Sequence, residues 1–288
     1  MKENIKQLNF FNNIEIEAIK TVSENEISIK IKGKEFKIVK LPLKYDKDVE
    51  IEIKMGLKAK ENFPNFIAID KKEQHDDSIY KIYEGIEDNK KLINERTLYK
   101  SGLQIGRYIK YSEDQSGIIN DGWAKKYLSS INKMIYQIDI SKSKPDNLYI
   151  VLDYINENKY LLKDYKFFYT PFLYDETGVE ISEDGRISLS GQKFYENSDF
   201  IYRMVNFPIS DGLKHLKKGI MDGYIGTESK SLFFKRYNFY YFIDKLQKVT
   251  YGFLEEKKEV ISEKLKDILK EYRMLESIFP DWYLKLNN

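Results

Sequence analysis

Carboxylates and lysines are prominent among the residues of this chain that could do chemistry, whereas cysteine and histidine are absent or scarce. The 288 residues include no cysteine and only two histidines. Thiolate nucleophiles, disulfides and histidine-rich metal sites are therefore excluded. Carboxylates instead gather in one stretch, which contains Asp175, Glu176, Glu180, Glu183 and Asp184. Carboxylates can act as general bases or as hard oxygen ligands for Mg²⁺.

A predicted β-hairpin runs through this stretch. The segments 179–182 and 186–189 read as two short strands around Asp184-Gly185, and Asp-Gly suits a tight turn because both residues tolerate positive φ. Glu180, Glu183 and Asp184 are expected to be solvated residues on the surface of this hairpin. Asp175 and Glu176 precede the hairpin, and for them a surface role and a catalytic role both stay open.

Composition narrows the class of protein. The chain is 42% hydrophobic and 15% aromatic, which is enough for a large core. Its 48 basic and 46 acidic residues leave a net charge of +2, so no strong field for nucleic acid or an anionic membrane is expected. No run approaches the roughly 18 apolar residues of a membrane span, and the first residues lack a signal-peptide pattern. We therefore expect a cytoplasmic protein.

The first ninety residues predict the order β-β-β-α-β-β. Apolar residues alternate with charged ones between positions 14 and 41, as in an antiparallel meander. Asp46 or Asp48 can cap the helix that follows. Two further strands are expected at 66–69 and 79–83, joined by a polar loop.

Helical spacing dominates after Glu87. Helices are expected at 97–111, 123–138, 148–165, 199–207, 231–251 and 260–275. Gly102 and Gly106 weaken the first of these but allow close packing against a neighbour. The change from strands to helices predicts a β-rich domain at 1–86 and a helical domain at 87–288, with the hairpin near 178–189.

This order resembles the aminoglycoside phosphotransferase and choline kinase group, the small-molecule branch of the protein-kinase-like fold. The resemblance implies an α+β bilobal fold, with a small antiparallel sheet lobe that has one helix and a larger helical lobe. The sequence Ile38-Val39-Lys40 looks like the strand whose lysine, here Lys40, grips the nucleotide phosphates. Glu50 or Glu52 is similar to the helix glutamate that orients this lysine.

Other local matches follow in the family's order. The segment 83–86 resembles the hinge that holds adenine by backbone groups, which implies cofactor-binding roles for Glu84 and Ile86. Asp199-Phe200-Ile201-Tyr202 resembles a structural aspartate motif that caps a helix. Gly223-Tyr224, followed by Arg236-Tyr237, is similar to the family's late helical segment.

The catalytic motifs of the family are largely missing. Its catalytic loop reads His-Gly-Asp with an Asn five residues on, whereas this chain has Phe172-Leu173-Tyr174 and Val179 there. A one-residue deletion brings Asp175 to the place of the catalytic aspartate. Where the family has its metal-binding aspartate, the chain reads Ser190-Gly191-Gln192, so no metal ligand is assigned. The nucleotide-covering loop has no glycine.

Three functions stay open on these grounds. The first is a pseudokinase that acts as a binding or regulatory partner of a protein or small molecule, with no cofactor. The second is a divergent phosphotransferase that uses ATP with Mg²⁺ on a small molecule or peptide, with carboxylates from the Asp175 region. The third is an unrelated α+β protein. We favour the first; the sequence names neither substrate nor partner.

Overall fold

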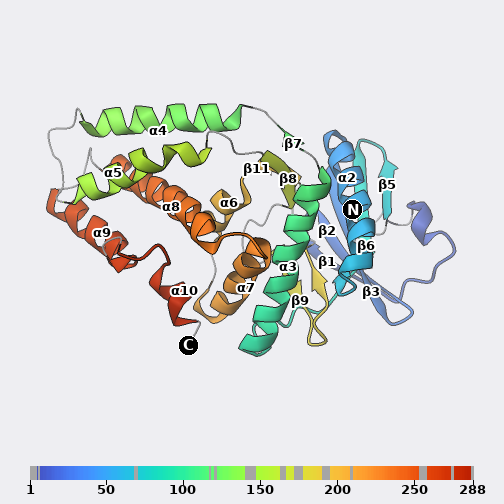
Figure 1. Cartoon of the computed structure of the whole chain (residues 1–288). Helices are drawn as coiled ribbons and strands as arrows, with labels where there is room; N and C mark the ends of the chain where they lie inside the picture. The colour runs from blue at the N-terminus through green and yellow to red at the C-terminus, as the bar shows by residue number, and fades with distance from the viewer. Residues whose placement is uncertain are drawn as a thin grey trace. The chain divides into compact units, whose positions relative to one another are not determined.

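The computed structural model describes the backbone of residues 5, 7–67, 71–116, 118–119, 122–139, 147–162, 167–171, 178–189, 195–207, 210–252, 258–273 and 276–286 (Figure 1). Its contacts divide the chain into two compact units. Unit 1 consists of Met1–Ser116, Thr170–Glu196 and Pro208–Tyr224, and unit 2 of Gly117–Tyr169, Asn197–Phe207 and Ile225–Asn288. The lobe boundary expected after Ile86 stays a prediction.

Unit 1 contains the predicted antiparallel sheet. It has the order β1-β2-β3-β6-β5, with β1 at Ala18–Ser23, β2 at Glu26–Ile31, β3 at Lys34–Pro42, β6 at Ser78–Glu84 and β5 at Lys71–His75. The antiparallel meander and the α+β class are confirmed.

Two strand predictions were placed wrongly. The first strand begins at Ala18, after Ile14 and Ile16, which pack against the core instead. The polar segment Lys71–His75 forms the edge strand β5, whereas the apolar Phe66–Ile67 forms β4 in another sheet. An edge strand pairs on one side only, so it can be polar. Its sequence then lacks the alternation of apolar and charged residues that indicates a strand.

The two faces of the sheet differ in chemistry. One face carries three cross-strand pairs of β3 and β6. These pairs are Phe36 with Glu84, Ile38 with Ile82 and Lys40 with Tyr80. The apolar members of this face pack on the N-terminal segment; the cluster contains Ile5, Leu8, Phe11, Ile27, Ile29, Ile31, Ile38, Tyr80 and Ile82. The other face carries Lys37, Val39 and Lys81.

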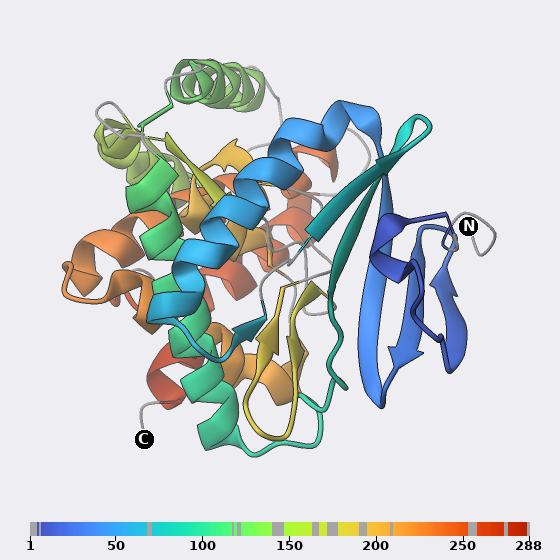
Figure 2. The same ribbon diagram turned by 90° about the vertical axis from the view of Figure 1, so that its right-hand side faces the viewer.

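Helix α2 (Asp46–Asn62) and the predicted hairpin lie on the side of the sheet opposite the N-terminal segment (Figure 2). The hairpin consists of β9 (Glu180–Ile181) and β10 (Ile187–Ser188), and β10 also pairs in parallel with β4. Gly185 has a φ of 81°, which fits the expected Asp-Gly turn. The hairpin is thereby anchored to the segment that follows α2.

A seam of glycines joins two helices of unit 1. Gly102 and Gly106 of α3 (Glu95–Ser116) face Gly219 and Gly223 of α7 (Lys214–Ile225). A methyl group added at any of the four would overlap backbone atoms of the opposite helix. The close packing expected of Gly102 and Gly106 is therefore confirmed, and α7 supplies the complementary pair.

Unit 2 is built around a long aromatic helix, α8 (Lys230–Gly252). The surrounding elements are α4 (Trp123–Asp139), α5 (Leu148–Asn158), α6 (Phe200–Asn206), α9 (Lys258–Lys270) and α10 (Asp281–Lys285), with the short strands β7 (Ile118–Ile119), β8 (Phe167–Pro171) and β11 (Tyr195–Ser198). Every aromatic side chain from Phe233 to Phe242 is buried, so this segment is core.

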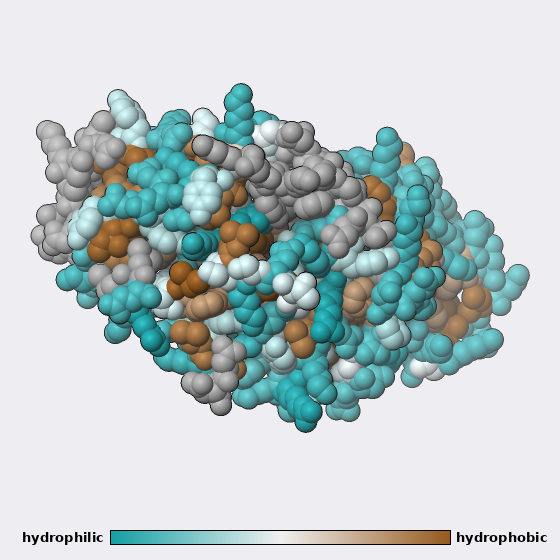
Figure 3. Space-filling model, in the orientation of Figure 1, coloured by the Kyte–Doolittle hydropathy of each residue, from teal (hydrophilic) through white to brown (hydrophobic). Residues whose placement is uncertain are grey.

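The exterior of the described chain is mostly polar. Hydrophilic side chains cover most of the face seen in Figure 3, with small apolar areas between them. None of the helices among the described residues is both long enough and apolar enough to span a bilayer.

Candidate functional site

The face of the sheet that looks toward α2 carries a buried lysine–glutamate pair. Lys81 of β6 lies opposite Val39 of β3, and its Nζ is 2.8 Å and 3.0 Å from the two carboxylate oxygens of Glu52 on α2. The side chains of Lys81 and Glu52 are 1% and 14% exposed. Burial raises the pKa of Glu52, and Lys81 offsets part of that rise. The pair thus fixes α2 to the sheet.

This pairing corrects the partner expected for the α2 carboxylates. Lys40 lies on the opposite face of the sheet, beside the apolar cluster, and the ion pairs found among the described residues do not include it. Glu50 joins Asp46 in binding Lys72 of β5, with both distances 2.6 Å. Strand side chains alternate between faces, so Lys40 cannot share the face of Lys37 and Lys81.

Lys81 could have been found in the sequence. It interrupts the apolar run Ile79-Tyr80-Lys81-Ile82-Tyr83. A lysine enclosed by such neighbours is rarely buried without a partner. The family resemblance instead pointed to Lys40, in the strand before α2.

A second ion pair joins β3 to the hairpin. Lys37 Nζ binds the Glu180 carboxylate, and the two side chains are 10% and 14% exposed. The Lys37 stem also passes beside Gly85, in the predicted hinge, where an added Cβ would lie 3.2 Å from Lys37 Cγ. Glu180, expected to be solvated, is therefore engaged, because the hairpin folds against the sheet.

A third charged side chain approaches this pair from β2. Burial raises the pKa of Glu26; nearby Lys37 lowers it and Glu180 raises it further. Glu26 and Glu180 therefore share the positive charge of Lys37. The neighbouring Ser28 donates to the Glu35 carboxylate, so the sheet is polar here too.

The predicted hinge is tied to the hairpin directly. Arg186 Nη1 is 3.2 Å from Glu84 Oε1, and the Asn89 amide donates to Ile181 O at 2.8 Å. Ile86 is only 4% exposed. The nucleotide-binding roles assigned to Glu84 and Ile86 stay predictions.

A largely buried ion pair lies next to the predicted hinge. Ligand pockets are lined mainly by apolar and aromatic surface, whereas here the Lys37–Glu180 pair spans from β3 to the hairpin. Separating a desolvated ion pair of this kind is costly.

The positions where the family has its catalytic and metal-binding aspartates lie outside the described residues. Asp175 and the segment 190–192 lie outside them, so the catalytic role of Asp175 stays a prediction. Within the described part of the chain, no three His, Asp or Glu side chains are grouped to hold a metal ion.

Unit 2 contains the expected structural aspartate. Asp199 is fully buried and caps α6, since its Oδ1 accepts from the Ile201 amide at 2.8 Å. Its Oδ2 accepts from Arg236 and from the Tyr240 hydroxyl, both on α8. The prediction that Asp199 caps a helix is confirmed, and Arg236, quoted with the late helical segment, is one of its partners.

Solved structures identify this architecture. An aminoglycoside phosphotransferase from Alicyclobacillus acidocaldarius matches with a TM-score of 0.54 and 10% identity, over 94% of this chain and 92% of the other. The AMP-bound spectinomycin phosphotransferase matches with a TM-score of 0.50 and 12% identity, over 98% and 94%. The chain has the aminoglycoside phosphotransferase fold.

The likeness is one of fold, and sequence comparison adds nothing to it. No protein-family model matches the chain, and no curated protein matches it in sequence. The phosphotransferase fold nevertheless confirms the expected protein-kinase-like architecture. It also removes the third alternative, an unrelated α+β protein.

Proposed function

We propose that this phosphotransferase-fold chain is a pseudokinase, which binds or regulates a partner and does not transfer phosphoryl groups efficiently. The observation that supports this most is the Lys37–Glu180 pair, which joins β3 to the hairpin beside the predicted hinge. Two charged side chains next to the predicted hinge thus bind each other.

The sequence supports the same proposal independently. Phosphoryl transfer depends on positioning and on neutralising phosphate charge with Mg²⁺. Ser190, Gly191 and Gln192 stand where the family has its metal-binding aspartate, and none of them can supply that charge. Loss of a general base typically costs about 10²–10⁴-fold in rate.

A second candidate is a divergent phosphotransferase that acts on a small molecule or peptide. The buried Lys81–Glu52 pair favours it, because a lysine held by a helix glutamate is what the family uses to grip phosphates. In that case Lys81 contacts the phosphates of ATP, and Glu52 orients it. The Mg²⁺ bound with ATP would neutralise phosphate charge, and Asp175 would be the catalytic carboxylate.

Nucleotide binding separates the two candidates. We would titrate the protein with ATP and with GTP by calorimetry, with and without Mg²⁺. The pseudokinase predicts no binding heat. Magnesium-dependent binding that is lost in Lys81→Ala and kept in Lys40→Ala would overturn the proposal in favour of the enzyme, since Lys40 lies on the other face of the sheet.

A further variant tests the closing pair itself. Glu180→Ala frees Lys37, and Glu183→Ala removes a neighbouring carboxylate of the same hairpin as a matched control. Our proposal predicts that ATP binding is absent in wild type and that only Glu180→Ala gains any. Equal, tight binding by all three proteins would show that the Lys37–Glu180 pair does not obstruct nucleotide binding.

A cytoplasmic location belongs to this proposal as well, on the strength of composition. Fractionation of the source cells would test it, and recovery with the membranes would contradict it.

A further inference from the structure

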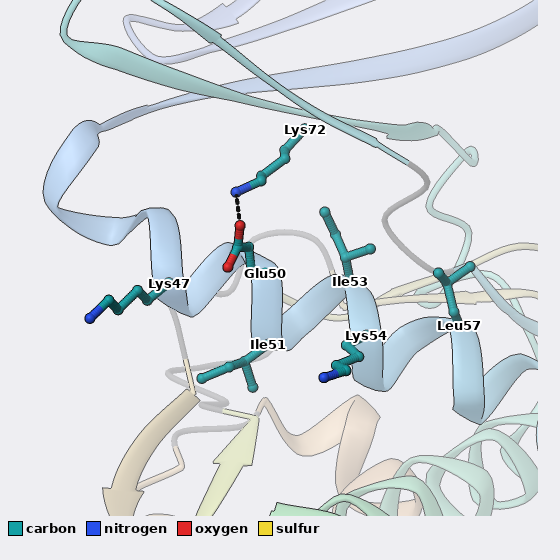
Figure 4. A pocket seen from close by; sticks show the side chains of 7 residues that line it. All are labelled: Lys47, Glu50, Ile51, Ile53, Lys54, Leu57 and Lys72. Atoms are coloured by element: carbon teal, nitrogen blue, oxygen red, sulfur yellow. Dashed lines mark hydrogen bonds and ion pairs between the residues drawn. The ribbon is translucent and has the colours of Figure 1, made fainter.

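Helix α2 and strand β5 form an open pocket on the surface of unit 1 (Figure 4). Six of its lining residues lie on α2 between Lys47 and Leu57, and Lys72 comes from β5. Its volume is about 640 Å³. We refer to it as the α2 pocket.

The α2 pocket has an apolar centre. Ile51 and Ile53 are half-buried, and Leu57 is 51% exposed. Val49 and Glu52 do not line the pocket. Val49 is fully buried, and Glu52 pairs with Lys81 of the sheet. A lone exposed leucine needs no explanation, but Ile53 and Leu57 lie one turn apart on the same side of α2 and together offer an anchoring point, whereas Ile51 points to another side of the helix (Figure 4).

The charges around this centre are unbalanced toward positive. Lys72 binds both Asp46 and Glu50 at 2.6 Å, so these two carboxylates are already engaged. These contacts also raise the pKa of Lys72 against the opposing effect of burial, so it stays charged. Lys47 and Lys54, both exposed, enter none of the ion pairs found among the described residues.

We propose that the α2 pocket docks a short acidic segment of a partner protein, with an apolar side chain seated against Ile53 and Leu57. Carboxylates of the segment would then approach Lys47 and Lys54. The inference rests on the proposed function as a binding partner, and it adds the chemistry of the partner.

A protein segment fits this surface better than a lipid bilayer does. A protein segment can place one side chain against Ile53 and Leu57 and carboxylates near Lys47 and Lys54 at the same time. The net charge of +2 over the whole chain also gives little long-range attraction to anionic lipid. Peptides that bind in this way present apolar anchors at helical or extended spacing.

A display experiment can test this without knowledge of the partner. A library of random peptides of about 12 residues, a length that covers a few anchor positions, is selected on the intact protein. Selected peptides are then titrated against wild type, Leu57→Glu and Lys54→Glu. Leu92→Glu and Lys34→Glu are matched controls: Leu92 is 80% exposed, and Lys34 lies at an exposed hairpin end away from α2.

We expect selected peptides that combine acidic residues with a large apolar one. Their affinity should fall at least about 10-fold in Leu57→Glu and about 3-fold in Lys54→Glu, with no change in the controls. All variants should keep the wild-type melting temperature, because the altered side chains are exposed.

Three outcomes would overturn the proposal: no enriched peptide, enriched peptides without acidic bias, or equal binding to Leu57→Glu. Sedimentation with phosphatidylserine vesicles that is lost in Leu57→Glu would replace the protein partner with a membrane. Nucleotide calorimetry is unaffected by any of these results, so failure of the docking site and failure of the proposed function are distinguishable.

Discussion

Buried carboxylates have different kinds of partners in the two units. In unit 2, Asp199 accepts from a backbone amide, an arginine and a tyrosine, so both of its oxygens are engaged. In unit 1, Glu180 binds Lys37, and Glu26 lies near enough to this pair for Lys37 to lower its pKa and Glu180 to raise it. Both oxygens of Asp199 thus have donors within the fold, whereas burial disfavours the ionised form of Glu26.

This difference suggests which parts of the fold are needed for stability and which have been altered. The Asp199 network and the glycine seam keep helices together, and they hold the fold without any ligand. The side of the sheet that faces α2 is held instead by the ion pairs Lys37–Glu180 and Lys81–Glu52, which we expect to contribute less to stability than the Asp199 network and the glycine seam do. The predictions below test this distinction, beginning with the largest expected effect.

Removal of the satisfied carboxylate should have the largest effect. We expect Asp199→Ala to lower the free energy of unfolding by about 4 kcal/mol, because Arg236 loses its buried counter-charge and α6 its cap. Urea unfolding followed by circular dichroism measures this. Asp211→Ala, which removes a 92%-exposed partner of Lys214, is the control and should unfold at nearly the same urea concentration as wild type. Equal losses of unfolding free energy in Asp199→Ala and Asp211→Ala would show that the Asp199 network is not needed for stability.

The glycine seam should come next. We expect Gly106→Ala to cost about 3 kcal/mol, because the new Cβ overlaps the backbone at Ile220 and Tyr224 and the helices must separate. This loss exceeds the roughly 1 kcal/mol gained in helix propensity. Gly212→Ala, where no atom lies within 4 Å of the added Cβ, should be nearly neutral in the same urea experiment. A neutral Gly106→Ala would mean that the helices are not in close contact.

The Lys81–Glu52 pair should have an intermediate effect. We expect Lys81→Met to cost about 2 kcal/mol, because Glu52 is left buried without a partner and must take up a proton. The double variant Lys81→Met/Glu52→Leu should recover most of the loss, since an apolar pair can replace a buried ion pair. Failure of the double variant to recover in urea unfolding would show that the pair itself is favourable.

The smallest effect should be a gain in stability at Glu26. Its folded-state pKa lies above the ordinary 4.5, chiefly through burial, so the ionised form is disfavoured by folding. We therefore expect Glu26→Gln to melt slightly higher than wild type at about pH 7.5. The difference should shrink as the pH falls through the raised pKa and vanish below the ordinary value. A difference that grew on acidification would contradict the assigned shift.

Local patterns were sufficient for much of the architecture. Alternation in β2 and β3, the 3.6-residue spacing in α4 and α8, and Asp184-Gly185 each predicted their element, because strands, helices and tight turns depend on nearby residues. The cap at Asp199 was expected from the family resemblance, and it too is a local contact within a few residues of its helix terminus. The edge strand β5 was not, because its polar sequence carries no pattern.

The site was less predictable than the fold. The absence of the family's catalytic motifs is a property of the sequence alone, as is the choice of carboxylates and lysines as the available chemistry. Which lysine meets which carboxylate depends on strand parity and on pairs distant in the chain. Lys37 and Glu180 are 143 positions apart, and Lys81 and Glu52 are 29. A shift of one residue moves a side chain to the other face of a sheet. Only the tertiary structure could therefore assign Lys37 and Lys81, and not Lys40, to the face of the sheet that looks toward α2.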